Sequence, residues 1–178
     1  MTVEHLPPAE ALARRRDAIV GEWLARTLRS YPLHTARFLL QDPDPFRNPV
    51  GQALQRGLPA LFDELLGTMD AIRVRSSLDS IVRIRAVQDF TPSQAVGFVF
   101  LLKEVLREQG PVPAEFERRI DQLALAAFDL YMECREKIAE IKVDEARRAV
   151  GAVNRAATGC PPNRAATVRE RSPGGESP

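Results

Sequence analysis

The chain has 178 residues, of which 44% are hydrophobic and 28% charged, so we expect one globular domain with a sizeable core. The formal net charge is only +1, which excludes the strongly basic field of a nucleic-acid or anionic-membrane binder. The sequence has two cysteines and no recognisable signal peptide, and no apolar run approaches the roughly 18 residues of a membrane span. We therefore expect a cytoplasmic protein without structural disulfides.

Helical periodicity dominates the first half of the chain. After a leader over residues 1–8, apolar residues at spacings of three, four and seven predict a helix over 9–30. A short apolar piece over 36–40 and a helix over 49–67 follow. The run Arg14-Arg15-Arg16 is interpreted as the solvated side of the first helix, because no further basic cluster supports a nucleic-acid patch.

A proline-rich loop over residues 42–51 separates the short apolar piece from the following helix. Asn48 is expected to cap that helix, with Pro49 at its first position. Phe46 is expected to anchor the loop in the core.

A polar trio interrupts the next predicted helix, over residues 72–89. At about 100° per residue, Arg85, Gln88 and Asp89 fall on the apolar face of this helix. In a structural interpretation, Arg85 pairs with Asp89, and Gln88 contacts a loop or the last helix. In a functional interpretation, the three residues line a cavity or a switch.

Thr91-Pro92-Ser93-Gln94 predicts the start of the following helix, because it has the pattern of a capping box with proline at the first position. That helix is apolar nearly all round, as expected of a central helix.

The last predicted helix begins near Pro113 and continues past Ala149. Its apolar content falls beyond Ile141, so its second half either projects into solvent or pairs with a partner helix. The candidate contacts with a partner or a second copy are Ile138, Ile141 and Glu145. Residues 151–178 are polar without periodicity and predict a disordered tail, which leaves residues 9–150 as the domain.

Residue types that carry catalysis or bind metals are sparse and scattered. His5, His34, Cys134 and Cys160 are isolated, so neither a zinc site nor a nucleophile with a neighbouring base is predicted. Phosphate-binding glycine loops and an axial haem ligand on the central helices are also missing. Cys134 is interpreted as a core cysteine, with a redox-active thiol as the alternative. We therefore predict no enzymatic activity, no metal and no cofactor.

Three segments, residues 44–51, 83–96 and 126–138, resemble the RsbT co-antagonist RsbRD N-terminal domain family in their order and spacing. The resemblance spans about residues 10–148. It implies a globin-like, all-helical, non-haem sensor domain, commonly dimeric, joined by a long helix to a STAS domain that holds a switch kinase inactive. Only a polar tail follows Arg148, so we expect a stand-alone member that lacks a STAS domain.

These observations predict an all-α, globin-like bundle with a long C-terminal helix. We expect a non-catalytic cytoplasmic sensor of stress or redox signalling that contacts a protein partner through this helix and forms a homodimer. The ligand or switch candidates are Arg85, Gln88, Asp89, Phe90, Tyr131, Cys134 and Arg135. The alternatives are a structural dimerisation or adaptor protein, and a small apolar-ligand binding protein with a pocket near the same corner.

Overall fold

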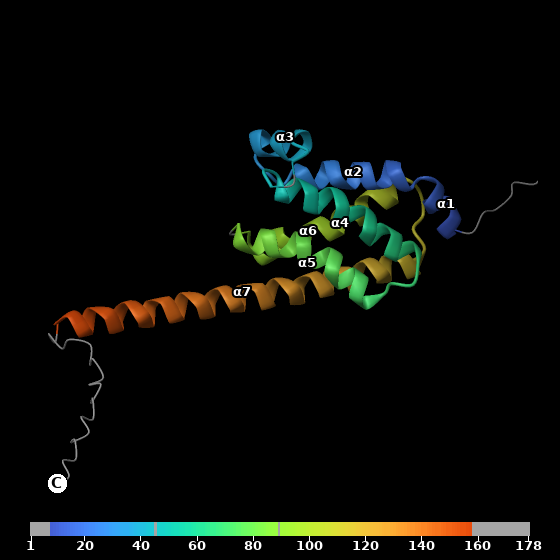
Figure 1. Cartoon of the computed structure of the whole chain (residues 1–178). Helices are drawn as coiled ribbons and strands as arrows, with labels where there is room; N and C mark the ends of the chain where they lie inside the picture. The colour runs from blue at the N-terminus through green and yellow to red at the C-terminus, as the bar shows by residue number, and fades with distance from the viewer. Residues whose placement is uncertain (1–7, 45, 89, 158–178) are drawn as a thin grey trace, which may run out of the picture. The chain divides into compact units, whose positions relative to one another are not determined.

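The computed structural model describes residues 8–44, 46–88 and 90–157, which form helices and, within these ranges, no strand (Figure 1). The helices are α1 (Pro8–Arg14), α2 (Arg16–Leu28), α3 (Leu33–Gln41), α4 (Pro49–Leu66), α5 (Ala71–Val87), α6 (Pro92–Glu108) and α7 (Ala114–Ala157). The predicted all-α class with a long C-terminal helix is therefore confirmed. The globin-like arrangement stays a prediction.

The chain divides into two compact units within α7. The first unit ends at Ala139 and contains α1 to α6 with the first part of α7, and the second begins at Glu140. The predicted tail from residue 151 is wrong at its start, because α7 continues to Ala157. The rest of that tail and the first seven residues of the predicted leader lie outside the described residues.

The predicted helix over residues 9–30 is two helices. Arg15, with ψ of 8°, interrupts the helical hydrogen bonding, and its N–H donates to Leu12 O only three residues back. A helix break at a single residue hardly changes the spacing of the apolar residues, so the sequence pattern did not predict it.

Asn48 joins the end of α3 to the start of α4. Its Oδ1 accepts from Gly51 N at 2.8 Å, which confirms the predicted cap, and its Nδ2 donates to Leu39 O at 2.9 Å. Glycine is required at position 51, because a Cβ there would lie 2.3 Å from Leu39 O. Phe46 is 95% exposed, so its predicted role as a core anchor is wrong. The buried amide of Asn48 fixes this loop instead.

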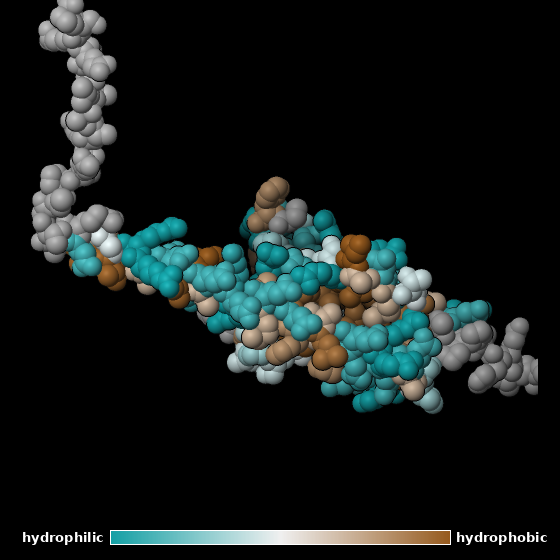
Figure 2. Space-filling model, turned by 90° about the horizontal axis from the view of Figure 1, so that it is seen from below, coloured by the Kyte–Doolittle hydropathy of each residue, from teal (hydrophilic) through white to brown (hydrophobic). Residues whose placement is uncertain are grey.

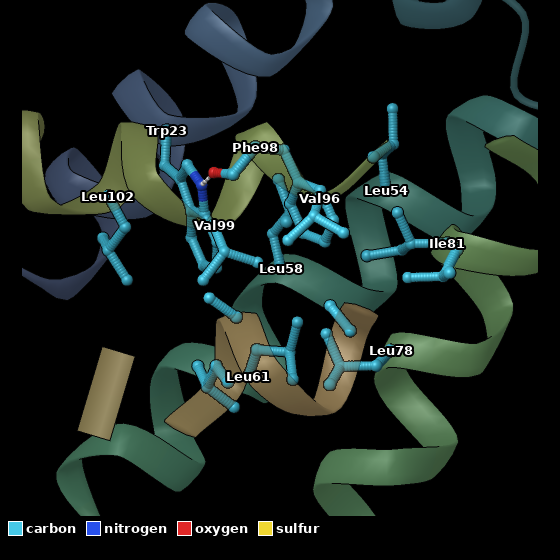
Figure 3. Packing of buried hydrophobic residues seen from close by; sticks show 14 of the residues in the cluster. Trp23, Leu54, Leu58, Leu61, Leu78, Ile81, Val96, Phe98, Val99 and Leu102 are labelled. Carbon is cyan, nitrogen blue, oxygen red and sulfur yellow. Dashed lines mark hydrogen bonds between the residues drawn. The ribbon is translucent and has the colours of Figure 1, made fainter. Parts of the chain in front are cut away.

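Helices α2, α4, α5 and α6 form the core of the first unit. Helix α4 packs against α2 and α5, and α2 packs against α6. Trp23 is fully buried, and its Nε1 donates to Phe98 O at 2.6 Å across the α2–α6 contact (Figure 3). Since α6 contributes buried side chains to this core along its length, it positions the corner at its own N-terminus.

Candidate functional site

The corner between α5 and α6 is built by two local devices. Helix α5 ends at Val87, with Gln88 as its C-cap. Helix α6 begins with the predicted capping box: Thr91 N donates to Gln94 Oε1 at 3.0 Å, and Gln94 N donates to Thr91 Oγ1 at 3.4 Å. The end of α5 and the start of α6 are therefore close in the chain, and each is defined by its own capping residues.

Arg85, in the last turn of α5, is buried beneath this corner with 1% of its surface exposed. Its Nη1 donates to Gln94 O at 3.0 Å, and its Nη2 donates to Ser30 Oγ at 3.2 Å. One guanidinium thus connects the end of α5, the first turn of α6 and the residues that follow α2.

Aromatic rings surround the Arg85 guanidinium. Its Cζ lies 5.2 Å from the centre of the Tyr31 ring, 5.0 Å from that of Phe90 and 5.2 Å from that of Phe98. Desolvated cation–π contacts of this kind contribute about 2 kcal/mol each. Among the described residues no carboxylate forms an ion pair with Arg85, and the groups that contact its guanidinium are the three rings and two neutral oxygen acceptors. Burial lowers the pKa of this guanidinium, which nevertheless stays protonated.

Two polar atoms of this cluster have no hydrogen-bond partner among the described residues. They are Arg85 Nε and the hydroxyl of Tyr31. Burial raises the pKa of the Tyr31 phenol, and the charge of Arg85 opposes this shift without cancelling it. Each unsatisfied buried group costs roughly 1–3 kcal/mol. The corner therefore combines favourable aromatic contacts with polar groups that are left unsatisfied.

Helix α7 binds the same corner through two backbone carbonyls. The hydroxyl of Tyr131 donates to Phe90 O at 2.7 Å, and Arg135 Nη1 donates to Ala86 O at 3.2 Å. Ala86 lies in the last turn of α5, where carbonyls have no partner within the helix. Four of the predicted site residues, Arg85, Phe90, Tyr131 and Arg135, thus lie together at this corner.

Other predicted site residues do not join them. Gln88 is exposed, because α5 ends before it and the helical phase no longer applies. The predicted pair of Arg85 with Asp89 cannot be assessed, since Asp89 lies outside the described residues. Cys134 is partly buried, and burial raises the pKa of its thiol, which disfavours a thiolate at neutral pH.

Sequence reasoning missed Ser30, Tyr31 and Phe98 as members of this cluster. Ser30 ends the predicted helix over residues 9–30 and Tyr31 follows it, whereas Phe98 lies in the apolar helix predicted after Gln94. Ser30 lies 55 positions from Arg85, and its hydroxyl also donates to Thr27 O at 2.6 Å. No local pattern records contacts at such separations.

A groove of about 670 Å³ lies between α6 and α7 and begins at the first turn of α6, and Arg85 is not among its lining residues. It is lined by Pro92, Ser93, Val96, Phe100, Asp121, Ala124, Leu125 and Phe128. The lining includes none of Arg85, Phe90 and Tyr131, near which an apolar-ligand pocket had been predicted.

Within the described part of the chain, no helix has the length and apolar character needed to cross a membrane. The same residues contain no cluster of three or more His, Cys, Asp or Glu side chains that could hold a metal ion.

The fold and the corner define a helical domain in which one buried arginine joins the end of α5, the first turn of α6 and the residues that follow α2. Residues 17–110, from α2 to just beyond α6, match the family model described as the RsbT co-antagonist protein rsbRD N-terminal domain. The chain belongs to this family of stress-signalling regulators, and the resemblance seen in the sequence is confirmed.

The chain is also similar to an uncharacterized protein of Archaeoglobus fulgidus. The two are 26% identical over 140 residues, which cover 73% of this chain and 83% of the relative. No solved structure matches the chain.

Proposed function

We propose that the protein is a non-catalytic, cytoplasmic regulatory module of stress or redox signalling that acts by contact with a protein partner. The contact is made by the helical residues of the second unit, from Glu140 to Ala157. The supporting observation is that Val143, Val150 and Val153 are 48%, 60% and 67% exposed there.

These valines belong to one stripe of the helix. Val143, Ala146, Val150 and Val153 follow one another at spacings of three and four residues, as in the seam of a paired helix. A helix that exposes such a seam gains stability by burying it against a partner helix.

The predicted contacts Ile141 and Glu145 lie on the other side of this helix from the valine stripe, at about 100° per residue. Ile138, the third predicted contact, is half-buried in the first unit. We therefore assign the partner contact to the stripe and keep Ile141 as the test of the alternative face.

The signal in this proposal acts at the Arg85 corner. Tyr131 and Arg135 bind the backbone of Phe90 and Ala86, so a shift of either carbonyl changes the hydrogen bonds of α7. Regulation of this kind requires two populated arrangements of the corner, each with a different affinity for the partner.

The experiment is capture from lysate of the native host by the full-length protein, followed by mass spectrometry and purification of the captured partner. With the purified partner, Val150→Glu is expected to weaken binding by at least about tenfold, whereas Ile141→Glu leaves it unchanged. The reverse result would assign the contact to the predicted face. Equal binding by both variants would refute a contact through this helix.

A structural adaptor is the competing function, and Arg85 distinguishes the two. If the protein is an adaptor, the affinity of Arg85→Met for the partner should equal that of the wild type, with or without the stimulus. A regulator with this substitution binds but no longer responds.

A further inference from the structure

Among the described residues, Arg85 is the one charged side chain that the fold buries. Other charged side chains lie at or near the surface, where teal polar residues cover much of the face shown in Figure 2. A surface charge stays hydrated, whereas a buried charge loses its water and requires compensation inside the protein. The polar atoms around Arg85 therefore indicate whether its compensation is complete.

The groups around Arg85 do not use all of its donors. Nη1 and Nη2 each donate one hydrogen bond, to Gln94 O and Ser30 Oγ, whereas Nε has no acceptor among the described residues. The buried hydroxyl of Tyr31 also has no partner there. The two side chains are neighbours, because the Arg85 Cζ lies 5.2 Å from the centre of the Tyr31 ring. Burial raises the pKa of the Tyr31 phenol, and the nearby charge of Arg85 opposes that shift.

Both unused groups can donate, so they suit an acceptor. An arginine Nε only donates, and the Tyr31 hydroxyl has a proton to give. One negative charge accepts from both atoms and also neutralises the guanidinium, which no carboxylate among the described residues does. A water molecule also accepts from both, but it brings two hydrogens that need acceptors and leaves the charge of Arg85 in place.

We propose that Arg85 Nε and the Tyr31 hydroxyl together bind a small monovalent inorganic anion such as chloride or nitrate. The rings of Tyr31, Phe90 and Phe98 border the guanidinium, so a bound ion must give up most of its water. This favours singly charged anions, which hold water weakly, over sulfate or phosphate. A divalent anion also needs more donors than the two that are unused here.

Phe90 connects this site to helix α7. Its ring centre lies 5.0 Å from the Arg85 Cζ, and its carbonyl accepts from the Tyr131 hydroxyl at 2.7 Å. The anion is then the signal at this corner, and this consequence alone rests on the proposed function. Anion binding itself is tested without a partner, so the two proposals can fail separately.

The first test is thermal unfolding of the full-length protein at a constant 200 mM salt, as sodium gluconate is replaced by sodium chloride or sodium nitrate. Salts of weakly hydrated anions do not stabilise proteins in general, so a saturable rise in Tm indicates binding to the folded state. We expect a rise of roughly 3–6 °C. A wild type whose Tm stays constant or falls throughout the replacement would overturn the proposal.

Two tyrosine variants form a matched pair. In gluconate, Tyr31→Phe should be at least as stable as the wild type, but its rise in Tm should need at least about tenfold more chloride, because one donor is gone. Tyr131→Phe is the control: its hydroxyl already donates to Phe90 O, so the rise should keep its wild-type midpoint from a lower starting Tm. Arg85→Met should show no rise. Equal chloride responses of the wild type and Tyr31→Phe would exclude this site.

Bromide locates the anion directly, because it has the charge of chloride and scatters X-rays anomalously. In crystals of the full-length protein grown in sodium bromide, a peak is expected within hydrogen-bonding distance of both Arg85 Nε and the Tyr31 hydroxyl. Bromide bound only at the surface, or a water molecule between these two atoms, would refute the anion site.

The purified partner tests the role of the anion as a signal. Its affinity for the wild type should change at least about threefold when chloride replaces gluconate, and its affinity for Tyr31→Phe should not change at the same chloride concentration. An unchanged affinity for a wild type that shows the rise in Tm would refute the signalling role. Val150→Glu tests the partner contact independently, because it lies in the second unit and should keep the chloride response of the wild type.

Discussion

At the scale of single residues, Arg85 is the unusual feature of this protein. A buried charge ordinarily has an opposite charge beside it, because desolvation alone costs several kcal/mol. Here three aromatic rings and two neutral oxygen acceptors take that role among the described residues. This arrangement depends on the planar, many-donor guanidinium, which a lysine does not reproduce.

We predict that Arg85→Lys destabilises the protein more than Arg85→Met does. Lysine keeps the buried charge but cannot reach both Gln94 O and Ser30 Oγ, so we expect a loss of about 2–4 kcal/mol in the free energy of unfolding. Methionine removes the charge and, among the residues that the structure describes, leaves no opposite charge behind, so its effect should stay within about 1 kcal/mol of the wild type. Urea unfolding of both variants measures the difference. Equal losses of unfolding free energy in the two variants would mean that the buried charge itself does not destabilise the lysine variant.

The two tyrosines of the corner provide a second comparison. Tyr131→Phe removes the donor to the Phe90 carbonyl, so we expect a loss of about 1–3 kcal/mol. Tyr31→Phe removes a hydroxyl that has no partner among the described residues, so it should be neutral or slightly stabilising. Thermal unfolding at neutral pH should separate the two variants clearly, and a larger loss for Tyr31→Phe would contradict the described hydrogen bonding.

Tyr31 also has a consequence at alkaline pH. Because its pKa is raised in the folded state, the unfolded chain releases this proton first as the pH rises above about 10. The stability that the neutral phenol contributes is therefore complete below that pH and is lost above it. Tyr31→Phe should flatten the fall in unfolding free energy on this alkaline side, which urea unfolding between pH 8 and 11 would measure.

Cys134 is expected to be a slow nucleophile. Burial raises the pKa of its thiol, so little thiolate is present at neutral pH. In a Cys160→Ser variant, iodoacetamide should modify Cys134 at pH 7 much more slowly in the native protein than in urea. Rapid native alkylation would instead support the redox interpretation.

At the scale of helices and their connections, the α3–α4 junction is the tightest local contact. The Asn48 side chain occupies the space beside Gly51, and Leu39 O approaches it from the preceding helix. The junction therefore depends on the absence of a side chain at one position.

We predict opposite effects of the same substitution at two glycines. Gly51→Ala forces the Asn48 amide and the Leu39 carbonyl apart and should destabilise the protein by about 2–4 kcal/mol. Gly97→Ala, inside α6 with no atom within 4 Å of its new Cβ, should stabilise it by about 0.5–1 kcal/mol. Denaturant unfolding of the two variants tests this, and a stable Gly51→Ala would show that the junction can rearrange.

At the scale of the whole molecule, the two units differ in how their helices are stabilised. The first unit buries a continuous apolar core, whereas residues 140–150 are all exposed. Isolated helices without tertiary packing are marginal in water, so stability should differ along α7 itself.

Hydrogen exchange on the full-length protein should show this difference. Amides over residues 142–155 are expected to exchange by local opening, much faster than those of α6, which exchange only on global unfolding. Addition of the proposed partner should slow exchange over residues 142–155. Protection of this segment equal to that of α6 in the free protein would contradict the division into two units.

Much of this protein follows from its sequence, because the responsible interactions span only a few residues. The Asn48 cap, the Thr91–Gln94 capping box and the burial of Arg85 on an apolar helix face all depend on residues at most four apart or on helical period. The same rules failed for Gln88, since they assume a helix that in fact ends at Val87.

Only the tertiary structure decided what surrounds Arg85. Ser30 and Tyr31, more than fifty positions earlier in the chain, meet it because α2 packs against α6, and Tyr131 joins the corner from α7. The period of a helix determines which side chains turn inward. Which of them meet is determined by the packing of distant helices, and a hydrophobic pattern carries no record of those pairings.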